Sequence, residues 1–208
     1  MVKVLKKDWG KETNEYIQAK HKIQKMTVLE KREAFGFNKM HEDEEWKPLT
    51  HKNGFIVEPY EMSQYGKCRN KSTDKILLAS DSYGIKGKRT YPGYSVKINT
   101  KAWEDYTKTK RPPRKSDTNT TFVFSFTAHQ GTMNTWKPFH EHLLPELEEY
   151  WPKFSPELKT VIRDAMLIDH IDDNPWNCHI DNLTYTTWSG NEWHNKITQN
   201  NTPEENNE

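Results

Sequence analysis

The chain has 208 residues, of which 33% are hydrophobic and 29% are charged. This length suits one domain or a small catalytic core with an accessory module, and we expect two lobes. No stretch is apolar enough to cross a membrane, and the basic first residues lack the apolar run of a secretory signal, so we expect a cytoplasmic protein. Cys68 and Cys178 form no CxxC pair, which argues against a disulfide framework and a structural zinc site. Any metal would therefore be bound by oxygen and imidazole.

The net charge is only +1, but the charges are unevenly distributed along the chain. Ten Lys and Arg side chains lie between Lys86 and Lys115, against Glu104 and Asp105, so this basic block carries a net charge of +8. Most of the balancing acid lies in residues 42–45, in residues 141–157 and in the last residues. A solvated surface is the usual reason for such a block, and a track for nucleic-acid phosphates is the alternative.

Residues 1–40 are predicted to form a helical arm. Tyr16, Ala19, Ile23 and Met26 recur at helical spacing, and Thr27 with Glu30 three residues later is a capping box that opens a second short helix. Packing of this arm on the core is the preferred interpretation. An extended arm lying on DNA is the alternative.

Residues 41–135 are predicted to be rich in β-structure. Residues 46–70 contain short apolar runs broken by Gly, Pro and Asn, which indicates short strands and tight turns. Residues 91–99 alternate in polarity and residues 121–126 are rich in Phe and Val, so both are predicted strands. Residues 108–120, between them, form a charged loop broken by prolines.

Residues 136–199 are predicted to form a third region. In residues 138–160 helix-favouring residues alternate with prolines, which indicates short helices that begin at proline. Residues 200–208 are too polar to be buried and are expected to be a disordered tail.

Residues 165–196 are the most informative part of the chain. Residues 165–169 are predicted to form a strand that presents Asp169 and His170 at its end, and residues 183–187 a second strand that returns beside it. Ser189 would begin a helix with Glu192 in its third position. The expected order is therefore strand, loop, strand and helix.

The polar residues of this segment suit hydrolysis of a phosphodiester bond. Asp169 and Asn191 could supply two oxygen ligands to one divalent ion, Mg²⁺ or Mn²⁺, and leave positions for phosphate oxygens and water. His170 follows Asp169 on the strand, so its side chain points the other way. A neutral imidazole suits a general base at neutral pH. His194 and Asn195 would share the helical face of Asn191.

These residues resemble the HNH motif of phage and intron-encoded homing endonucleases. The pattern DHIDxNPxNxxxxNL is nearly continuous from Asp169 to Leu183 and is far more specific than isolated His and Asn positions. The resemblance implies a ββα-metal fold, a phage-infected host cell, double-stranded DNA as the partner, and one divalent ion. It implies that Asp169 and Asn191 bind this ion and that His170 is the general base.

The resemblance also implies a structural role for Asn182, whose side chain would tie the loop between the strands. Either His194 or Asn195 is a further candidate ligand, and the sequence leaves the choice open. The overall prediction is an α+β protein, with a small β-rich N-terminal and middle region and a C-terminal ββα-metal motif.

Residues 44–70 are similar to the NUMOD4 module that often precedes this nuclease motif. The chain departs from the family where the helix that usually precedes the motif is matched only loosely, at residues 140–147, so His140 and His142 are not candidates. No helix-turn-helix follows the motif, so either DNA recognition is expected upstream or the sequence specificity is expected to be low. The expected contacts with backbone phosphates are Lys86, Lys88, Arg89, Lys97, Lys108, Lys110, Arg111, Arg114 and Lys115.

Each of these polar residues alone would suit a turn, a surface or a helix cap, and only their joint spacing favours a nuclease. A DNA-binding regulator that does not cut is the alternative function. A single motif predicts a monomer that nicks one strand, with a dimer left open. Trp188 and Trp193 are expected in the core rather than stacked on bases.

Overall fold

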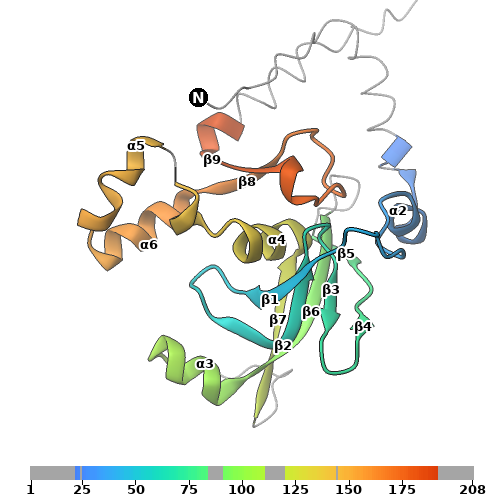
Figure 1. Cartoon of the computed structure of the whole chain (residues 1–208), viewed down its shortest axis with the longest axis horizontal. Coiled ribbons are helices and arrows are strands. Elements are labelled where there is room, and N and C mark those ends of the chain that lie inside the picture. The colour runs from blue at the N-terminus through green and yellow to red at the C-terminus, as the bar shows by residue number, and fades with distance from the viewer. Residues whose placement is uncertain (1–21, 24, 84–90, 111–119, 144, 192–208) are drawn as a thin grey trace, which may run out of the picture.

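The computed structural model describes residues 22–23, 25–83, 91–110, 120–143 and 145–191. Within these ranges the protein is a mixed α+β structure with three small antiparallel sheets of four, three and two strands (Figure 1). The α+β prediction is therefore confirmed at this level. In the same ranges, no helix has the length and apolar character needed to cross a membrane.

The first sheet contains the short strands predicted for residues 46–70. Its order is β1 (Trp46–Thr50), β2 (Ile56–Ser63), β3 (Cys68–Asn70) and β4 (Lys75–Ile76). Val57, Met62 and Cys68 are fully buried. One face of this sheet therefore contributes to the hydrophobic core.

The second sheet has the order β5 (Ser80–Tyr83), β6 (Tyr91–Asn99) and β7 (Thr121–Thr127). The two strands predicted for residues 91–99 and 121–126 are confirmed to within one residue. Val96 pairs with Phe124 on the core side, whereas Ser95 and Ser125 pair on the exposed side and their hydroxyls lie 2.8 Å apart. This period of two is what an alternating strand requires.

The capping box predicted at Thr27 is present at the start of α2 (Val28–Ala34). The Thr27 amide donates to Oε2 of Glu30 at 2.7 Å, and the Glu30 amide donates to Oγ1 of Thr27 at 3.3 Å. Of the preceding helix, Tyr16 and Ala19 lie outside the described residues.

Two helices that the sequence analysis did not assign follow β6 and β7 directly. Oδ1 of Asn99 accepts the Ala102 amide at 2.9 Å and caps α3 (Thr100–Thr107). At the start of α4 (Ala128–Trp136), Oε1 of Gln130 accepts the Thr127 amide at 3.2 Å. Helix α4 lies between the larger sheets and the last hairpin (Figure 1).

Short helices occupy the region after Lys137, as predicted. They are η1 (Phe139–Glu141), α5 (Pro145–Glu148), η2 (Trp151–Lys153) and α6 (Pro156–Ala165). Proline stands in the first turn of α6, where Oγ of Ser155 accepts the Leu158 amide at 3.2 Å. Because α6 continues to Ala165, the predicted strand cannot begin there, and it begins at Leu167.

The last sheet pairs β8 (Leu167–His170) with β9 (Leu183–Thr186), and His170 stands opposite Leu183. Residues 188–191 are helical, so the helix begins two residues earlier than it would with Ser189 as its cap. The reason is that Thr187 caps it: Oγ1 of Thr187 accepts the Gly190 amide at 3.2 Å and its carbonyl accepts the Asn191 amide at 2.9 Å. The order of strand, loop, strand and helix agrees with the sequence as far as Asn191.

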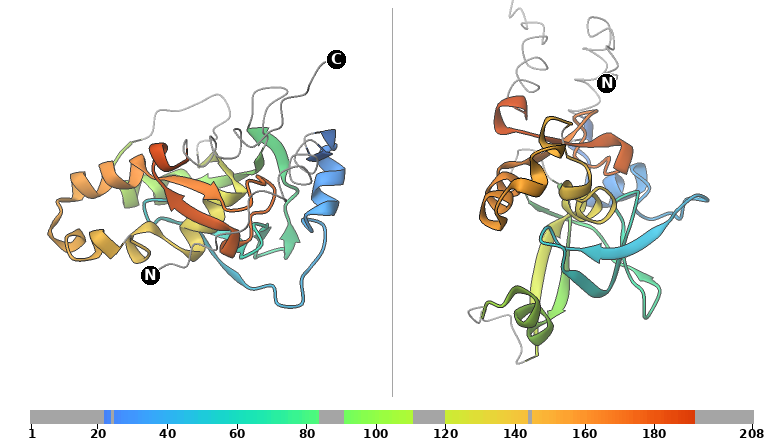
Figure 2. Two further views of the ribbon diagram at one scale, coloured as in Figure 1. Left: turned by 90° about the horizontal axis from the view of Figure 1, so that it is seen from above. Right: turned by 60° about the vertical axis from the view of Figure 1, so that its left-hand side comes forward.

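One hydrophobic cluster joins the three predicted regions. It contains Phe37 from the segment after α2, Leu49 and Tyr94 from the larger sheets, and Trp176 and Cys178 from the loop between β8 and β9. In two directions of view this last hairpin lies between α6 on one side and α2 on the other (Figures 1 and 2).

The prediction that Trp188 belongs to the core is wrong, since its side chain is 71% exposed. Its place at the first turn of a helix that projects from β9 explains this exposure. Trp193 lies outside the described residues.

A buried ion pair supports the turn between β2 and β3. The side chains of Lys67 and Glu44 are 1% and 0% exposed, and Nζ of Lys67 lies 2.5 Å from Oε2 of Glu44. Nζ also donates to the carbonyl of Lys39. Such pairing offsets the cost of burying both charges. It fixes the turn that carries Gly66.

Gly66 marks a close approach between this turn and the loop that follows β8. Its φ is +82°, and a Cβ atom added there would lie 2.4 Å from Cβ of Cys178. Neither feature tolerates a side chain, because the left-handed conformation favours glycine and buried backbone cannot move aside easily.

We expect Gly66→Ala to destabilise the fold more than Gly54→Ala does. Gly54 has a similar φ of +90°, but an added Cβ atom would meet only the hydroxyl of Tyr106, at 2.9 Å. Both variants share a conformational penalty of about 1–2 kcal/mol, and Gly66→Ala adds an overpacking penalty of about 1–3 kcal/mol. Urea unfolding of the two variants measures the difference. Equal losses would show that the contact with Cys178 does not constrain the fold.

Candidate active site

Residues 171–182, which connect β8 to β9, are held closed by their own side chains. Oδ1 of Asp172 accepts Nδ2 of Asn182 at 2.8 Å, and Oδ2 accepts Nδ2 of Asn177 at 2.7 Å. In return Oδ1 of Asn182 accepts the Asp172 amide at 3.1 Å. Asn182 thus joins the two ends of the loop, by side-chain hydrogen bonds of the kind that the sequence analysis expected of it.

The same loop is anchored on the body of the protein. Trp176 is 1% exposed and packs edge-on against Phe37, with ring centroids 5.5 Å apart. In η3 (Ile180–Asn182) the Ile180 amide donates to the Gln64 carbonyl at 2.8 Å, and Nζ of Lys137 donates to the Ile180 carbonyl at 2.9 Å. The loop therefore has a fixed position relative to the first sheet and α4.

Three residues predicted from the sequence line one cavity. Its volume is about 240 Å³, and it includes Asp169 and His170 from the end of β8 and Asn191 from the helix after β9. The remaining lining residues are Tyr91, Ile168, Asp173 and Pro175. The hairpin and the helix that follows it thus bring together side chains that are 21 or 22 residues apart in the sequence. His194 and Asn195 lie outside the described residues.

Local contacts orient the two residues at the end of β8. Oδ1 of Asp169 accepts the His170 amide at 2.9 Å. His170 is only 5% exposed, and its Nε2 lies 4.0 Å from Sγ of Cys178. Burial raises the pKa of the Cys178 thiol, so this neighbour is neutral. The imidazole of His170 therefore sits against an uncharged sulfur on one side.

Asp173 also lines the cavity, although the sequence analysis did not name it as a candidate. It is 4% exposed, has a φ of +56°, and its amide donates to the His170 carbonyl at 2.8 Å. Aspartate adopts this left-handed conformation more readily than most residues. The tight turn after β8 thus directs a second carboxylate toward the same space as Asp169.

His129 and Tyr91 form a group of three rings together with His170, the candidate base. The His129 ring lies edge-on to His170 at 5.1 Å, and Tyr91 lies 5.0 Å from His129 and 5.9 Å from His170. Tyr91 begins β6 and His129 stands in the first turn of α4. No local pattern links them to the motif, although the Thr127 to Gln130 capping pair could have predicted the helix.

His129 is uncharged at neutral pH. Burial, with a smaller contribution from the nearby His170, lowers its pKa to about 3. Nε2 of His129 lies 3.1 Å from Oγ1 of Thr127, while its buried Nδ1 has no hydrogen-bond partner among the described residues. A neutral ring thus packs behind His170.

The donor set of the cavity fits a divalent cation that binds oxygen. Asp169 and Asp173 offer carboxylates and Asn191 offers an amide oxygen. Mg²⁺ is typically held by one or two carboxylates and keeps other positions for water and substrate phosphate. In the described part of the chain no three His, Cys, Asp or Glu side chains form a metal-binding group. A divalent ion here would be held by the two carboxylates together with the Asn191 amide oxygen.

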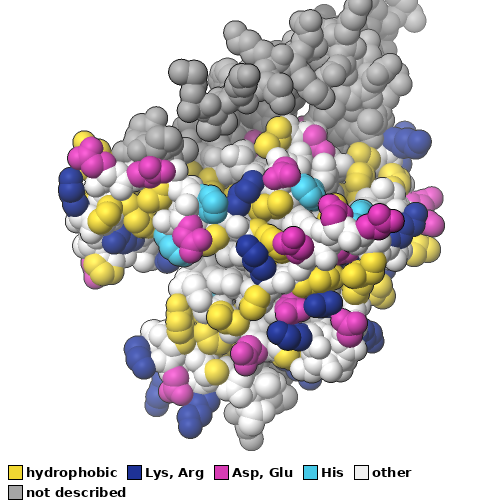
Figure 3. All heavy atoms as spheres, in the orientation of Figure 1, with side chains coloured by type: hydrophobic (Ala, Val, Ile, Leu, Met, Phe, Trp, Pro, Cys, Tyr) yellow, Lys and Arg dark blue, Asp and Glu magenta, His cyan; other side chains and the backbone are white. Residues whose placement is uncertain are grey.

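The described part of the basic block lies away from this cavity. Lys97 is exposed on β6, and Lys108 and Lys110 follow α3, at the opposite end of β6 from Tyr91. Figure 3 shows Lys and Arg side chains gathered over this part of the molecule. A strand of nine residues spans about 30 Å, so only an extended duplex could reach both places. The other predicted contacts lie outside the described residues: Lys86, Lys88, Arg89, Arg111, Arg114 and Lys115.

Comparisons with known proteins give no independent assignment. No family model, no curated protein and no solved structure matches the chain. The resemblance to HNH endonucleases and to NUMOD4 therefore stays a prediction from the residues themselves.

We expect His129 to make the fold sensitive to acid. Its folded pKa of about 3 lies below the ordinary value of 6.5, so its contribution is complete above pH 6.5 and is lost as the pH falls toward 3. Removing this group should flatten the pH dependence of the unfolding free energy by about 1.4 kcal/mol per pH unit between pH 6 and 4. Urea unfolding of His129→Gln at several pH values measures this change.

The matched control is His140→Gln, because the His140 side chain is exposed. In that variant the unfolding free energy should depend on pH as it does in the unsubstituted protein. If His129→Gln kept the same slope as His140→Gln, His129 would have to be charged or solvated in the folded state.

Proposed function

We propose that this protein is a metal-dependent DNA endonuclease of the HNH type, which hydrolyses phosphodiester bonds in double-stranded DNA. The observation that carries the proposal is the single cavity lined by Asp169, His170 and Asn191. Each residue comes from a position that the sequence motif predicts for phosphodiester hydrolysis. The contacts of Asn182 across the loop support the same motif.

His170 would accept the proton of the attacking water. Its Nε2 faces Sγ of Cys178, so Nδ1 is the candidate atom for this role. Tyr91 and His129 pack against the ring and restrict its rotation. A base that is held in place loses less freedom on reaching the transition state. The surrounding rings would thus preserve the orientation of the base between turnovers.

Asp169 and Asn191 would hold Mg²⁺ or Mn²⁺, and Asp173 is a further candidate ligand. A bound ion would supply positive charge for the phosphoryl and leaving oxygens. The hydrogen bond from the His170 amide to Asp169 holds one carboxylate oxygen, so the position of this candidate ligand is linked to that of the base.

A DNA-binding regulator that does not cut is the competing function. Such a regulator would explain the Lys and Arg side chains of the basic block, but it would not need His170 next to the carboxylates of Asp169 and Asp173. Cleavage of plasmid DNA with and without Mg²⁺ separates the two functions, because only the nuclease converts supercoiled DNA to an open or linear form.

We expect His170→Ala to lower the cleavage rate by about 10²–10⁴-fold, the usual contribution of a general base. DNA binding should be unchanged, since His170 is buried and would contact only the reacting water. Relaxation of supercoiled plasmid measures the rate, and fluorescence anisotropy with labelled duplex measures binding. His142→Ala is the exposed control, because His142 lines neither cavity, and it should cleave normally. A parallel loss of DNA binding in His170→Ala would contradict the assigned role.

We expect Asp169→Asn to weaken the binding of Mg²⁺ and Mn²⁺, measured by calorimetry on the protein alone. Asp181→Asn is the control, because Asp181 lies in the loop that follows β8 but its side chain is 81% exposed and does not line the cavity. Equal affinities for the ion in the two variants would remove Asp169 from the ligand set.

We also expect a monomer to nick one strand per encounter. One set of Asp169, His170 and Asn191 provides one base, and antiparallel strands would need a second set related by two-fold symmetry. A duplex labelled separately on each strand, with the mass of the protein measured alongside, tests this outcome. Simultaneous cutting of both strands by a stable dimer would overturn it.

A further inference from the structure

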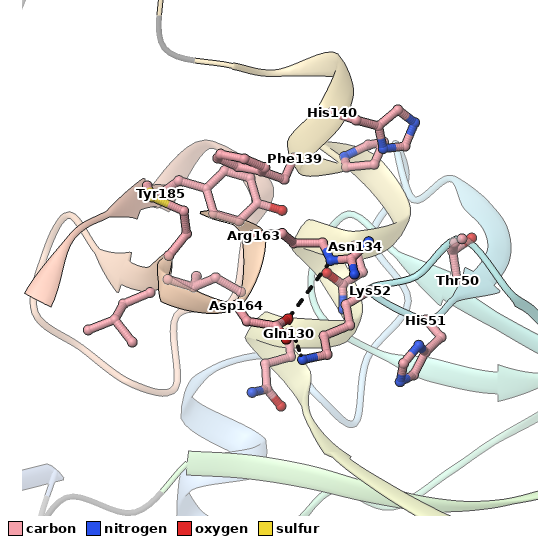
Figure 4. A pocket seen from close by; sticks show the side chains of 15 residues that line it. Thr50, His51, Lys52, Gln130, Asn134, Phe139, His140, Arg163, Asp164 and Tyr185 are labelled. Atoms are coloured by element: carbon pink, nitrogen blue, oxygen red, sulfur yellow. Dashed lines mark hydrogen bonds and ion pairs between the residues drawn. The ribbon is translucent and has the colours of Figure 1, made fainter. Parts of the chain in front are cut away.

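A second cavity lies next to β8, between the turn that joins β1 to β2, α4, and the end of α6 (Figure 4). Its volume is about 260 Å³. Lys52 comes from the turn, Asn134 from α4, and Arg163 and Asp164 from the last turn of α6. The walls thus combine cationic and amide groups from three separate segments.

The cavity has more positive than negative charge. Nζ of Lys52 lies 2.8 Å from Oδ1 of Asp164, and Nε of Arg163 lies 3.9 Å from the same oxygen (Figure 4). Two permanent cations therefore face one lining carboxylate. The Lys52 and Asp164 side chains are 51% and 45% exposed, and ion pairs in such places are weak. An incoming anion could therefore displace Asp164 from Lys52.

Arg163 provides the second observation that indicates a ligand. Its Nε is buried and makes no hydrogen bond with any described residue, because Asp164 at 3.9 Å is too distant. The other end of the guanidinium is bound weakly, since Nη2 donates to Oγ1 of Thr160 at 3.4 Å. A buried donor without a partner is unfavourable until an acceptor arrives, and the planar guanidinium matches the oxygens of a phosphate.

The two cavities are neighbours. Ile168 lines both, and Asp169 is the next residue on β8. Two residues of a strand span about 7 Å. Duplex DNA has one phosphate for each 3.4 Å of its axis on a strand, or roughly two phosphates in this distance. One DNA strand could therefore present successive phosphates to both cavities.

We propose that the cavity around Arg163 and Lys52 binds a backbone phosphate of the DNA strand that lies in the candidate active site. This inference rests on the proposed nuclease function and adds a binding site that the sequence motif does not contain. Arg163 would donate Nε to a phosphate oxygen, and Lys52 would exchange its carboxylate partner for the phosphate.

The first test measures DNA binding without cleavage. Arg163→Gln and Lys52→Gln are each made in the His170→Ala background, and binding to a labelled duplex is followed at several salt concentrations with EDTA present. Because both side chains would contact the same phosphate, removing both should reduce the slope of log K against log salt by about 0.9, the value for one lost phosphate contact, and each single variant should give part of that reduction. Lys75→Gln, on the exposed strand β4, should leave the slope unchanged. Thermal melting checks that all variants are folded.

The second test locates the contact on the DNA. Single phosphates are replaced by uncharged methylphosphonates along a duplex, and each duplex is bound to His170→Ala protein with or without Arg163→Gln. One replacement should weaken binding when Arg163 is present and have no further effect in the Arg163→Gln variant. If every replacement weakened both proteins equally, the inference would be wrong.

These results are separable from the proposed function. A protein that never cleaves DNA but shows the Arg163-dependent slope would retain the phosphate site and lose the nuclease assignment. A protein that cleaves DNA while Arg163→Gln and Lys75→Gln give the same slope would retain the nuclease and lose the phosphate site. Failure to bind duplex DNA at all would overturn both.

Discussion

The closure of residues 171–182 by Asp172, Asn177 and Asn182 is the constraint on which the candidate site depends. These side chains form hydrogen bonds across the loop, and this closure fixes the register in which β8 pairs with β9. The same loop places Trp176 and Cys178 in the hydrophobic core. Polar closure and apolar anchoring together fix the end of β8. This arrangement sets the backbone positions of Asp169 and His170, and their own contacts then orient the two side chains.

The two cavities that share Ile168 suggest a division of roles along β8. Oxygen donors and an imidazole gather at the end of the strand, whereas a guanidinium and an ammonium gather near its start. A hydrolytic site needs groups that react and groups that hold the substrate, and these requirements conflict in a small space because cations repel a metal ion. Separating them by a short length of strand resolves this conflict. The cations after α3 lie much farther away and could contact only a distant part of the duplex.

The sequence predicted features that depend on near neighbours in the chain. Strands β6 and β7 follow from their composition and alternation, and the capping box at Thr27 follows from two residues. Boundaries were less predictable, because α6 continues to Ala165 and Thr187 competes with Ser189 as the cap. The rings around His170 could not be predicted, since His129 lies 41 residues before it and reaches it only through the packing of α4. The prediction that Trp188 lies in the core was wrong because hydrophobicity alone does not place a residue in the core. The roles in metal binding and cleavage stay predictions.

The rings of Tyr91 and His129 limit how the ββα motif could be transferred to another protein. Because the ββα motif is about thirty residues long and continuous in the sequence, one would expect that it can be moved between proteins as one segment. The rings that pack against the imidazole of His170, however, come from β6 and α4, which precede this motif in the chain. If the hairpin were grafted onto another protein, it would keep its carboxylates and its loop, but His170 would lose its contacts with Tyr91 and His129. Transplantation of this site therefore requires β6 and α4 in addition to the ββα motif.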